Sequence, residues 1–552
     1  MKSWLNRWIL VAGLLTPLAS DAAPEMATAT WPQADPAAIA RWQAKRFGMF
    51  IHFGPVSLTG EEIGWSRGAE TPIEIYDNLY KRFNPPNFNA EAWVSIAKMA
   101  GMKYIVLTAK HHDGFCLWDT RFSDYNIMKT PFHRDLVAEL AVACKKRGMA
   151  FGTYYSTCDW WHPDFPLTSP GGSVKREKSD LDAYNRYLLS QVGELITKYG
   201  PLLTIWNDVP QRFEGRGAQT IRLVRSLQPG ILINDRTGDG GDYDTPEQRI
   251  GKYQDNRPWE TCMTLCEQWS WKPNDKMKSL EQCLRTLVRC AGGDGNLLFN
   301  VGPMPTGEIE PRQVQRLKEI GEWLVKNGES IYGTRGGPWK PNRVMASTRK
   351  DRMIYLHILE SKADTVELPT IPCKVLTANL LNGDPIQFLQ QNGKLSLNLP
   401  AAKRQPVETI LKLEIDGSAM DLTAQEIPSD VRATASNIYH NQVAEYGPQF
   451  AIDGDPDTRW ATDAGKSQAW IAVSFNSPRT VRSVAIREAF ERVRKFELQY
   501  RDGEHWKTIF TGTTLGERFR RRFAPVTARE FRLNILEAVD GPTISEIELS
   551  EN

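Results

Sequence analysis

The sequence predicts a multidomain protein that begins with a distorted (β/α) barrel of the TIM type. Segments typical of strands and helices alternate from about Arg46 to Gly328, and repeated units of this kind indicate a parallel sheet. After Gly336 the pattern changes to short strands between turns, which is typical of a small antiparallel β-sandwich. At 552 residues the chain is also too long for one compact domain, so two or three domains are expected.

Individual signals support the alternation in the barrel region. Asn89 is typical of a helix N-cap, and Gly101 is typical of a helix stop. The alternation is irregular between Gly238 and Lys278, and we therefore expect a distorted barrel. The expected strands are 46–54, 104–110, 150–156, 202–208, 231–235 and 296–301, and the expected helices are 89–101, 135–148, 181–200, 218–227, 279–291 and 312–327.

The remainder of the chain is expected to form two further β domains. The pattern changes again after Leu422, and the last region is rich in strands. The expected domains are a barrel at 24–336, a β-sandwich at 337–425 and a second β-sandwich at 426–552. The expected strands are 353–359, 365–368, 375–381, 394–399 and 410–415 in the first sandwich, and 469–475, 481–487, 496–501 and 531–535 in the second.

Residues 1–23 have the features of a signal peptide. Lys2 and Arg7 precede a short apolar segment, and small residues follow at a cleavage site. The apolar segment is too short to span a bilayer, and no later stretch is long and apolar enough for a membrane helix. The sequence therefore predicts a secreted or periplasmic protein.

Composition argues against some functions and favours others. The 68 basic residues nearly balance the 66 acidic ones, so charge gives no case for nucleic acid as a partner. The 18 tryptophans favour sugars, whose C–H faces stack on aromatic rings. The eight cysteines form no C-x-x-C pair and have no matched histidines, so we expect buried thiols and no metal or other cofactor for catalysis.

One apolar run ends in an acid. Leu202–Ile205 reads as a buried strand and is followed directly by Trp206, Asn207 and Asp208. Packing gives no reason for a carboxylate there. In barrels of alternating strands and helices, catalytic side chains lie at the carboxyl ends of the strands. Asp208 is therefore the first candidate for a catalytic residue.

Polar and aromatic residues also gather at the ends of the other expected strands. A single histidine is more often structural than catalytic. Five clusters at the same end of five strands indicate a common pocket, because that end of a barrel forms one site. Histidine and tyrosine can exchange hydrogen bonds with sugar hydroxyls, and arginine can bind a carboxylate. The clusters are His52, His111–Asp113, Tyr154–Tyr155, Trp206–Asp208 and Asn234–Arg236.

Glycoside hydrolysis requires a second carboxyl group across the scissile bond. Two stretches after the strand at Ile231 supply candidates, Asp242–Glu247 and Arg257–Glu260. The sequence gives distances along the chain and not across a pocket, so both stretches remain open on this argument.

Six motifs resemble the α-L-fucosidases of glycoside hydrolase family 29. They occur in the family's order across most of residues 40–335. The resemblance implies a retaining enzyme that acts on fucosylated oligosaccharides or glycoconjugates. The motifs are Phe47–Gly54, Lys103–Trp118, Phe151–Ser156, Ile205–Asp208, Asn234–Arg236 and Asn296–Gly302.

The resemblance also implies roles for individual residues. The family's nucleophile maps to Asp208. The Glu-Trp pair that many members place after the first strand is missing around Gly64, and Trp65 is a further candidate for the pocket. The implied fucose-binding residues are His52, His111, His112, Tyr154, Trp206 and Arg236.

The acid/base of the reaction has two candidates. The stretch Tyr243–Gln248 is similar to the branch of the family that cleaves α-1,3 and α-1,4 fucosyl linkages, which favours Glu247. Glu260 belongs to a Trp-Glu motif that is also common in the family and is the runner-up; its alternative is a structural acid at the start of a strand. The acid/base must begin protonated, and the two carboxyls of a retaining pair should lie about 5–5.5 Å apart.

The last domain resembles the discoidin-like modules, also named F5/8 type C or carbohydrate-binding family 32. The motifs are Ala451–Trp460, Ala469–Val473 and Ile544–Glu548. Oxygen ligands in these motifs suit a structural Ca²⁺, although a polar turn would explain the same loop. The candidate ligands are Asp453, Asp455, Thr458 and Glu546.

Two functional hypotheses follow. The first is a secreted retaining exo-α-L-fucosidase with a lectin-like module. The second is a catalytically silent glycan-binding protein on the same scaffold. The presence of Asp208 and of both candidate acids favours the enzyme, because a silent relative would be free to lose them.

Overall fold

The structure is a computed structural model that describes residues 33–169, 176–209, 216–360, 364–381, 383–428, 430–454 and 458–551. Two compact units are present. The first comprises the chain up to Gly337 together with Ser347–Tyr355 and Ser418–Asp421. The second comprises Pro338–Ala346, Leu356–Gly417 and the chain from Leu422 onward. The predicted signal peptide at residues 1–23 lies outside the described residues.

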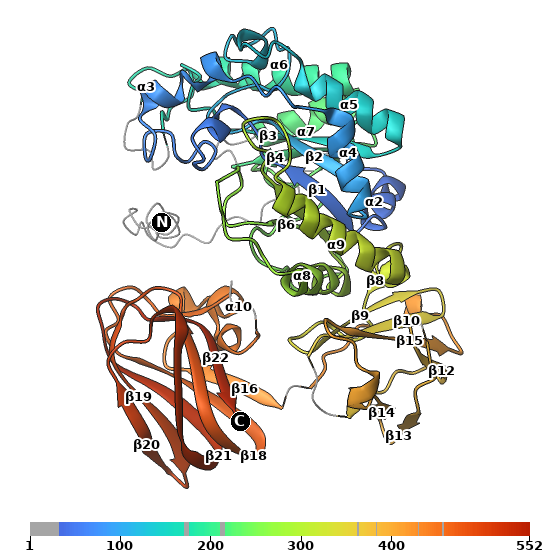
Figure 1. Cartoon of the computed structure of the whole chain (residues 1–552), viewed down its shortest axis with the longest axis vertical. Coiled ribbons are helices and arrows are strands. Elements are labelled where there is room, and N and C mark those ends of the chain that lie inside the picture. Colours follow the sequence, from blue (N-terminus) through green and yellow to red (C-terminus); the bar gives the residue numbers. More distant parts are fainter. Residues whose placement is uncertain are drawn as a thin grey trace, which may run out of the picture. The chain divides into compact units, whose positions relative to one another are not determined.

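The first unit contains a seven-stranded sheet in the order β5-β4-β3-β2-β1-β7-β6, in which all six neighbouring pairs are parallel. Helices coat its outer face (Figure 1). This architecture confirms the predicted barrel. The strands are β1 (Phe47–Ile51), β2 (Tyr104–Lys110), β3 (Ala150–Ser156), β4 (Thr204–Asp208), β5 (Leu232–Ile233), β6 (Glu260–Thr264) and β7 (Asn296–Val301).

Several helices of this unit begin or end at capping residues, including the predicted N-cap Asn89. The Asn89 side chain accepts the N–H of Ala92 at the start of α4, and Gly148 adopts the left-handed conformation after α5. Ser279 and Gln282 form a capping box at the start of α8. The helices are α2 (Pro36–Gln43), α3 (Ile73–Tyr76), α4 (Ala90–Met99), α5 (Leu136–Arg147), α6 (Leu181–Tyr199), α7 (Arg216–Leu227), α8 (Leu280–Gly292) and α9 (Pro311–Asn327).

An irregular segment fills the space between the two edge strands, β5 and β6. Tyr243 forms an isolated parallel bridge with Asn234, next to β5. On the other side, Asp244 and Glu247 form parallel bridges with residues at β6. The segment 243–247 therefore takes the place of an eighth strand. This distortion lies within the stretch 238–278, where the sequence predicted it.

The sheet register brings the carboxyl ends of the strands together. Ser156 pairs with Asp208, so β3 and β4 end at the same level. Below that level the barrel is filled by large buried rings, among them Trp42, Tyr104 and Tyr243. The packed interior leaves the carboxyl ends as the place for a pocket.

The second unit carries most of the antiparallel β structure. Two sheets follow the barrel, in the orders β12-β15-β10-β9-β8 and β11-β14-β13. They confirm the predicted small β-sandwich. The strands are β8 (Arg335–Gly336), β9 (Met345–Lys350), β10 (Met353–Ile358), β11 (Thr365–Pro369), β12 (Val375–Leu380), β13 (Phe388–Gln391), β14 (Lys394–Asn398) and β15 (Thr409–Ile415).

The last region forms its own seven-stranded antiparallel sheet system around a separate hydrophobic core. The core includes the buried side chains of Trp460, Phe496 and Phe531. The predicted strands 469–475 and 481–487 are continuous in the structure. The elements are β16 (Val431–Ala435), α10 (Val443–Tyr446), β17 (Trp460–Ala461), β18 (Ala469–Glu488), β19 (Val493–Asp502), β20 (His505–Gly512), β21 (Phe519–Ala538) and β22 (Thr543–Ser550).

Candidate active site

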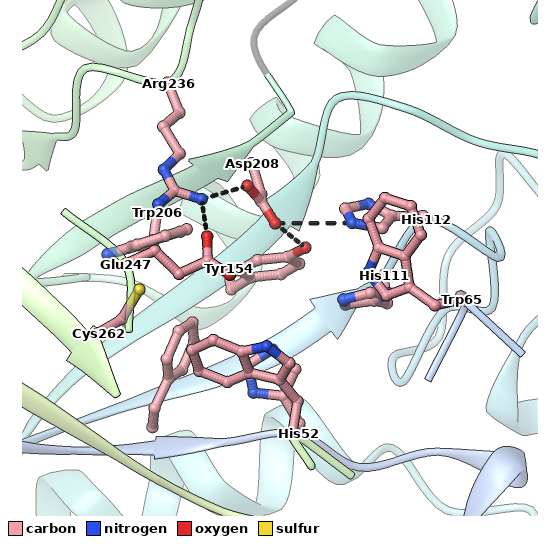
Figure 2. A pocket seen from close by; sticks show the side chains of 12 residues that line it. His52, Trp65, His111, His112, Tyr154, Trp206, Asp208, Arg236, Glu247 and Cys262 are labelled. Carbon is pink, nitrogen blue, oxygen red and sulfur yellow. Dashed lines mark hydrogen bonds and ion pairs between the residues drawn. The ribbon is translucent and has the colours of Figure 1, made fainter. Parts of the chain in front are cut away.

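A pocket opens at the carboxyl ends of the barrel strands (Figure 2). It gathers side chains from strand ends that are far apart in the sequence. Nine of its residues are those that the sequence predicted, and Phe50, Cys262 and Trp269 are additional. The lining residues are Phe50, His52, Trp65, His111, His112, Tyr154, Trp206, Asp208, Arg236, Glu247, Cys262 and Trp269.

Asp208, the last residue of β4, lies at the centre of a network of donors. Its carboxylate accepts a hydrogen bond of 2.7 Å from Tyr154 Oη and an ion-pair contact of 2.7 Å from an Arg236 nitrogen. His112 Nε2 lies 3.7 Å away. Burial opposes ionisation, but the charge of Arg236 and the surrounding donors hold the pKa of Asp208 below its usual value. Asp208 is therefore an ionised carboxylate.

Glu247 lies on the irregular segment that replaces the eighth strand. Its Oε2 is 2.8 Å from the same Arg236 nitrogen that contacts Asp208. Burial raises the pKa of Glu247, and the Asp208 charge raises it further, while Arg236 opposes the shift. The two carboxyl groups thus differ in their tendency to hold a proton.

The shared arginine also limits the distance between the two carboxyl groups. One nitrogen contacts an Asp208 oxygen at 2.7 Å and a Glu247 oxygen at 2.8 Å, so these oxygens are at most 5.5 Å apart. Figure 2 shows Arg236 between the two acids. Two carboxyl groups at this separation can act on opposite sides of a single bond.

Glu260 occupies a different level of the barrel. It is the first residue of β6, at the amino end of the strand, and it is absent from the described pocket lining. Tyr104 Oη donates to one carboxyl oxygen, and Trp206 Nε1 donates to the other at 3.3 Å. Burial raises the pKa of Glu260 to about 7. The carboxyl group supports the Trp206 ring from within the barrel core.

The three pocket histidines are neutral. Burial lowers the pKa of His52 to about 3 and that of His112 to about 4, and burial also lowers the pKa of His111. His52 Nδ1 is 2.6 Å from Oδ1 of Asn300, so its proton lies on Nδ1. Nε2 of His52 is then an acceptor. Neutral rings of this kind can bind the hydroxyl groups of a sugar.

Trp65 forms part of the pocket wall. Its ring centroid is 5.3 Å from that of His112 and 5.5 Å from that of Trp160, both edge-on. Gly64, which precedes it, has φ of +67°, and a Cβ there would lie 2.7 Å from Nδ1 of His111. The position before Trp65 therefore has no room for a side chain, which accounts for the missing Glu-Trp pair.

The sequence analysis did not predict three of the lining residues. Two of them, Phe50 and Cys262, could have been found from their spacing along a strand. Phe50 lies two residues before His52, and Cys262 lies two residues after Glu260. Alternate residues of a strand share a face, so this spacing places Phe50 and Cys262 toward the barrel interior. Trp269 follows β6 in a loop that has no such periodicity. All eight cysteines are free thiols.

One group of side chains in the pocket has a spacing that could hold a metal ion. His111, His112 and Asp208 each offer one ligand atom within 4.8 Å of the others. The Arg236 guanidinium already contacts Asp208 at 2.7 Å and supplies a positive charge at that carboxylate. The geometry is therefore that of an arginine–carboxylate pair rather than of a cation site.

The last domain places three of the four candidate calcium ligands near one another. Both oxygens of Asp453 accept from Thr458 Oγ1, at 3.0 and 2.8 Å. Burial, followed by the charge of Asp453, raises the pKa of Glu546 to about 8. Asp455 lies outside the described residues. Two neighbouring carboxyl groups, Asp453 and Glu546, are a donor set that fits a hard cation.

Comparison with known proteins identifies both regions. The sequence model of the family described as Alpha-L-fucosidase matches residues 14–329, and that of the F5/8 type C domain matches residues 432–549. The chain belongs to the α-L-fucosidase family. Plasma alpha-L-fucosidase of Homo sapiens is 30% identical over 420 residues, which cover 67% of this chain and 88% of the relative. This family member is accordingly a glycoside hydrolase.

Solved fucosidases share the fold. Alpha-L-fucosidase isoenzyme 1 from Paenibacillus thiaminolyticus is 33% identical, with a TM-score of 0.64, over 69% of this chain and 99% of that one. The α-fucosidase of Thermotoga maritima is 27% identical, with a TM-score of 0.59, over 68% and 96%. Within the described part of this fucosidase-family chain, no helix has the length and apolar character needed to cross a membrane.

Proposed function

We propose that this chain is a secreted or periplasmic retaining exo-α-L-fucosidase that uses Asp208 as nucleophile and Glu247 as acid/base. The observation that carries the proposal is the single Arg236 nitrogen that contacts both carboxyl groups. It keeps the two contacted oxygens at most 5.5 Å apart, and this limit includes the separation of about 5–5.5 Å found in retaining glycosidases. Inverting enzymes need a wider gap that leaves room for water.

In the first step, ionised Asp208 attacks the anomeric carbon of the fucosyl residue. The C–O bond to the leaving group breaks, and Glu247 donates its proton to the departing oxygen. The product is an ester between fucose and the Asp208 carboxyl. Arg236 and Tyr154 orient the carboxylate, since both contact it at 2.7 Å.

In the second step, Glu247 acts as a base. It takes a proton from a water molecule, which attacks the anomeric carbon and releases Asp208. Both displacements invert the configuration, so the sugar keeps its α configuration overall. Arg236, whose nitrogen lies 2.8 Å from Glu247 Oε2 in the free enzyme, can stabilise ionised Glu247.

The pocket supports an exo mode of action. Its walls combine aromatic rings with neutral histidines, which suits a terminal sugar unit. Structures of the Thermotoga maritima α-fucosidase include complexes with fucose and with a mechanism-based inhibitor. These relatives favour fucose as the sugar, and the stretch Tyr243–Gln248 favours α-1,3 and α-1,4 branches of glycoconjugates.

We propose in addition that the protein is exported and that its last domain binds glycans. The sequence features of residues 1–23 support export, and the F5/8 type C domain supports glycan binding close to the substrate. We also propose that Asp453, Thr458 and Glu546 hold a structural Ca²⁺, with Asp455 as a further ligand. A bound cation would neutralise the two facing carboxylates and stabilise the loop. Catalysis itself requires no metal in this account.

Hydrolysis of an aryl α-L-fucoside, followed by ¹H NMR, tests the proposal. The first product should be α-L-fucose, which later equilibrates with the β anomer. Asp208→Asn, which keeps the shape but removes the charge, should lower kcat at least about 10³-fold because it cannot form the ester. Initial release of β-L-fucose would contradict retention. Absence of turnover on aryl and branched natural fucosides would instead favour the silent glycan-binding protein.

A further inference from the structure

Two pocket rings come from loops that are far apart in the sequence. Trp65 follows β1, and Trp269 follows β6. The Trp269 ring centroid is 4.8 Å from that of His52 and 6.0 Å from that of Phe50. Trp65 lies against His112 on another side of the pocket. Both rings can enclose one sugar only if contacts between the two loops fix their relative positions.

We propose that Glu62 is a positioning residue that fixes both loops and so sets the shape of the sugar pocket. Its carboxylate accepts the backbone N–H of Trp269 at 3.0 Å through Oε2. Oε1 accepts the N–H of Ser270 at 3.1 Å and the N–H of its own neighbour Ile63 at 3.0 Å. One side chain thus joins segments about 207 positions apart.

Ser270 completes the connection in the opposite direction. Its Oγ donates to the carbonyl oxygen of Glu61 at 2.8 Å and accepts the N–H of Ile63 at 2.9 Å. The two loops therefore exchange hydrogen bonds in both directions. A carboxylate with several backbone donors is a stronger anchor than neutral contacts of the same number.

The link reaches both rings over a short length of rigid backbone. Ser66 donates its N–H at 3.1 Å and its Oγ at 2.7 Å to the carbonyl oxygen of Glu62, so a tight turn carries Trp65. On the other loop, Asn300 Nδ2 donates to the carbonyl oxygen of Trp269 at 2.7 Å. The Trp269 residue is therefore held at its N–H by Glu62 and at its C=O by Asn300.

Burying the ionised Glu62 carboxyl group costs free energy, which its hydrogen bonds offset. Burial raises the pKa of Glu62 to about 7, although the N–H donors of Trp269, Ser270 and Ile63 oppose the shift. Glu62 is absent from the described lining of the pocket. Its effect must therefore pass through Trp65 and Trp269, which makes substrate binding the step that it controls.

This inference rests on the proposed function, because it assumes that the pocket binds fucose. Glu62→Gln retains the size of the side chain but replaces one acceptor oxygen by an NH₂ group, which faces N–H donors. The loss of a charge-assisted bond of this kind predicts a KM for the aryl fucoside raised about tenfold, with kcat changed less than about threefold. Glu61→Gln is the matched control, since only its backbone joins the link.

Ser270→Ala provides a second variant that removes the side-chain hydrogen bonds but keeps the backbone N–H. It should raise KM about threefold and leave kcat unchanged. The inference is overturned if wild-type enzyme is active and both variants match its KM. It is also overturned if kcat falls as much as KM rises. If Glu62→Gln does not fold, the KM of Ser270→Ala alone tests the inference. An inactive wild-type protein would reject the proposed function instead.

Discussion

Arg236 contacts Asp208 and Glu247 through one nitrogen, yet the two acids have opposite protonation tendencies. Asp208 also accepts a hydrogen bond from Tyr154 Oη and lies near His112. Together with Arg236, these groups lower the pKa of Asp208 by more than burial raises it. Glu247 accepts no hydrogen bond from Tyr154 or His112 and lies near the negative charge of Asp208. Burial therefore has the larger effect and raises the pKa of Glu247. Two carboxyl groups with diverging pKa values are the arrangement that general acid catalysis by one and nucleophilic attack by the other require.

This difference predicts a bell-shaped dependence of kcat/KM on pH. The apparent pKa of the acid limb should lie below the usual pKa of aspartate, because Asp208 must be ionised and its pKa is lowered. The alkaline limb should lie above the usual glutamate range, because Glu247 must be protonated and its pKa is raised. Glu247→Gln, measured with a leaving group that needs no protonation, should lose the alkaline limb. An unchanged limb in that variant would assign it to another group.

The strands of the barrel were predictable because each is an apolar run that ends in polar or aromatic residues. β2, β3 and β7 have the predicted bounds, and β4 ends at Asp208 as expected. The direction of a parallel strand also separates the two candidate acids. Glu260 begins β6 and so lies at the amino end of the barrel, whereas pocket residues follow the carboxyl ends.

The position of Glu247 could not be obtained from the sequence. It depends on a segment that bridges β5 and β6 through isolated pairs and has no strand periodicity. The distance from Glu247 to Asp208 is set by that path across the barrel and not by spacing along the chain. Trp269 was missed for the same reason, since its loop position carries no periodic signal. Irregular segments are fixed by tertiary contacts, and these leave little trace in local sequence.

The irregular segment depends on Asp242, which is buried directly before it. Asp242 forms an ion pair with Arg225 and accepts the N–H groups of Ile233 and Ala34 at 2.8 and 3.0 Å. Asp242→Ala should lower the free energy of unfolding by about 3–5 kcal/mol, since it leaves a buried charge without this partner. Asp239→Ala, which removes a partly exposed acceptor for the N–H of Ala218, should cost only about 1 kcal/mol.

Urea denaturation followed by tryptophan fluorescence measures both costs, and kcat provides a second readout. Asp242→Ala should reduce kcat as well as stability, because Glu247 is carried by the displaced segment. A variant with equal stability and full activity would show that other contacts hold the segment.

At the scale of the whole molecule, the last domain has a core of its own. Its buried residues, including Trp460 and Phe531, all lie within residues 451–547. The chemistry, in contrast, is contained in residues of the barrel. The proposed Ca²⁺ should therefore affect the stability of the module without affecting turnover of a small substrate.

Removal of calcium tests this separation. Chelation by EDTA should lower the melting temperature of one calorimetric transition, and added Ca²⁺ should restore it, because a ligand bound only by the folded state stabilises that state. The kcat/KM for an aryl fucoside should stay within about twofold of its original value. Glu546→Gln should weaken the response to Ca²⁺. If neither EDTA nor Ca²⁺ changes the melting temperature, the loop is a polar turn and not a calcium site.

Azide rescue tests the central assignment most directly, because azide replaces a missing group in a different step for each acid. Asp208→Ala should form β-L-fucosyl azide, since azide attacks the α-fucoside directly and inverts it. Glu247→Ala should form α-L-fucosyl azide, since azide attacks the ester on Asp208, and Glu260→Ala should form neither. Formation of the α azide by Glu260→Ala, or of the β anomer by Glu247→Ala, would contradict the assignment of Asp208 as nucleophile and Glu247 as acid/base.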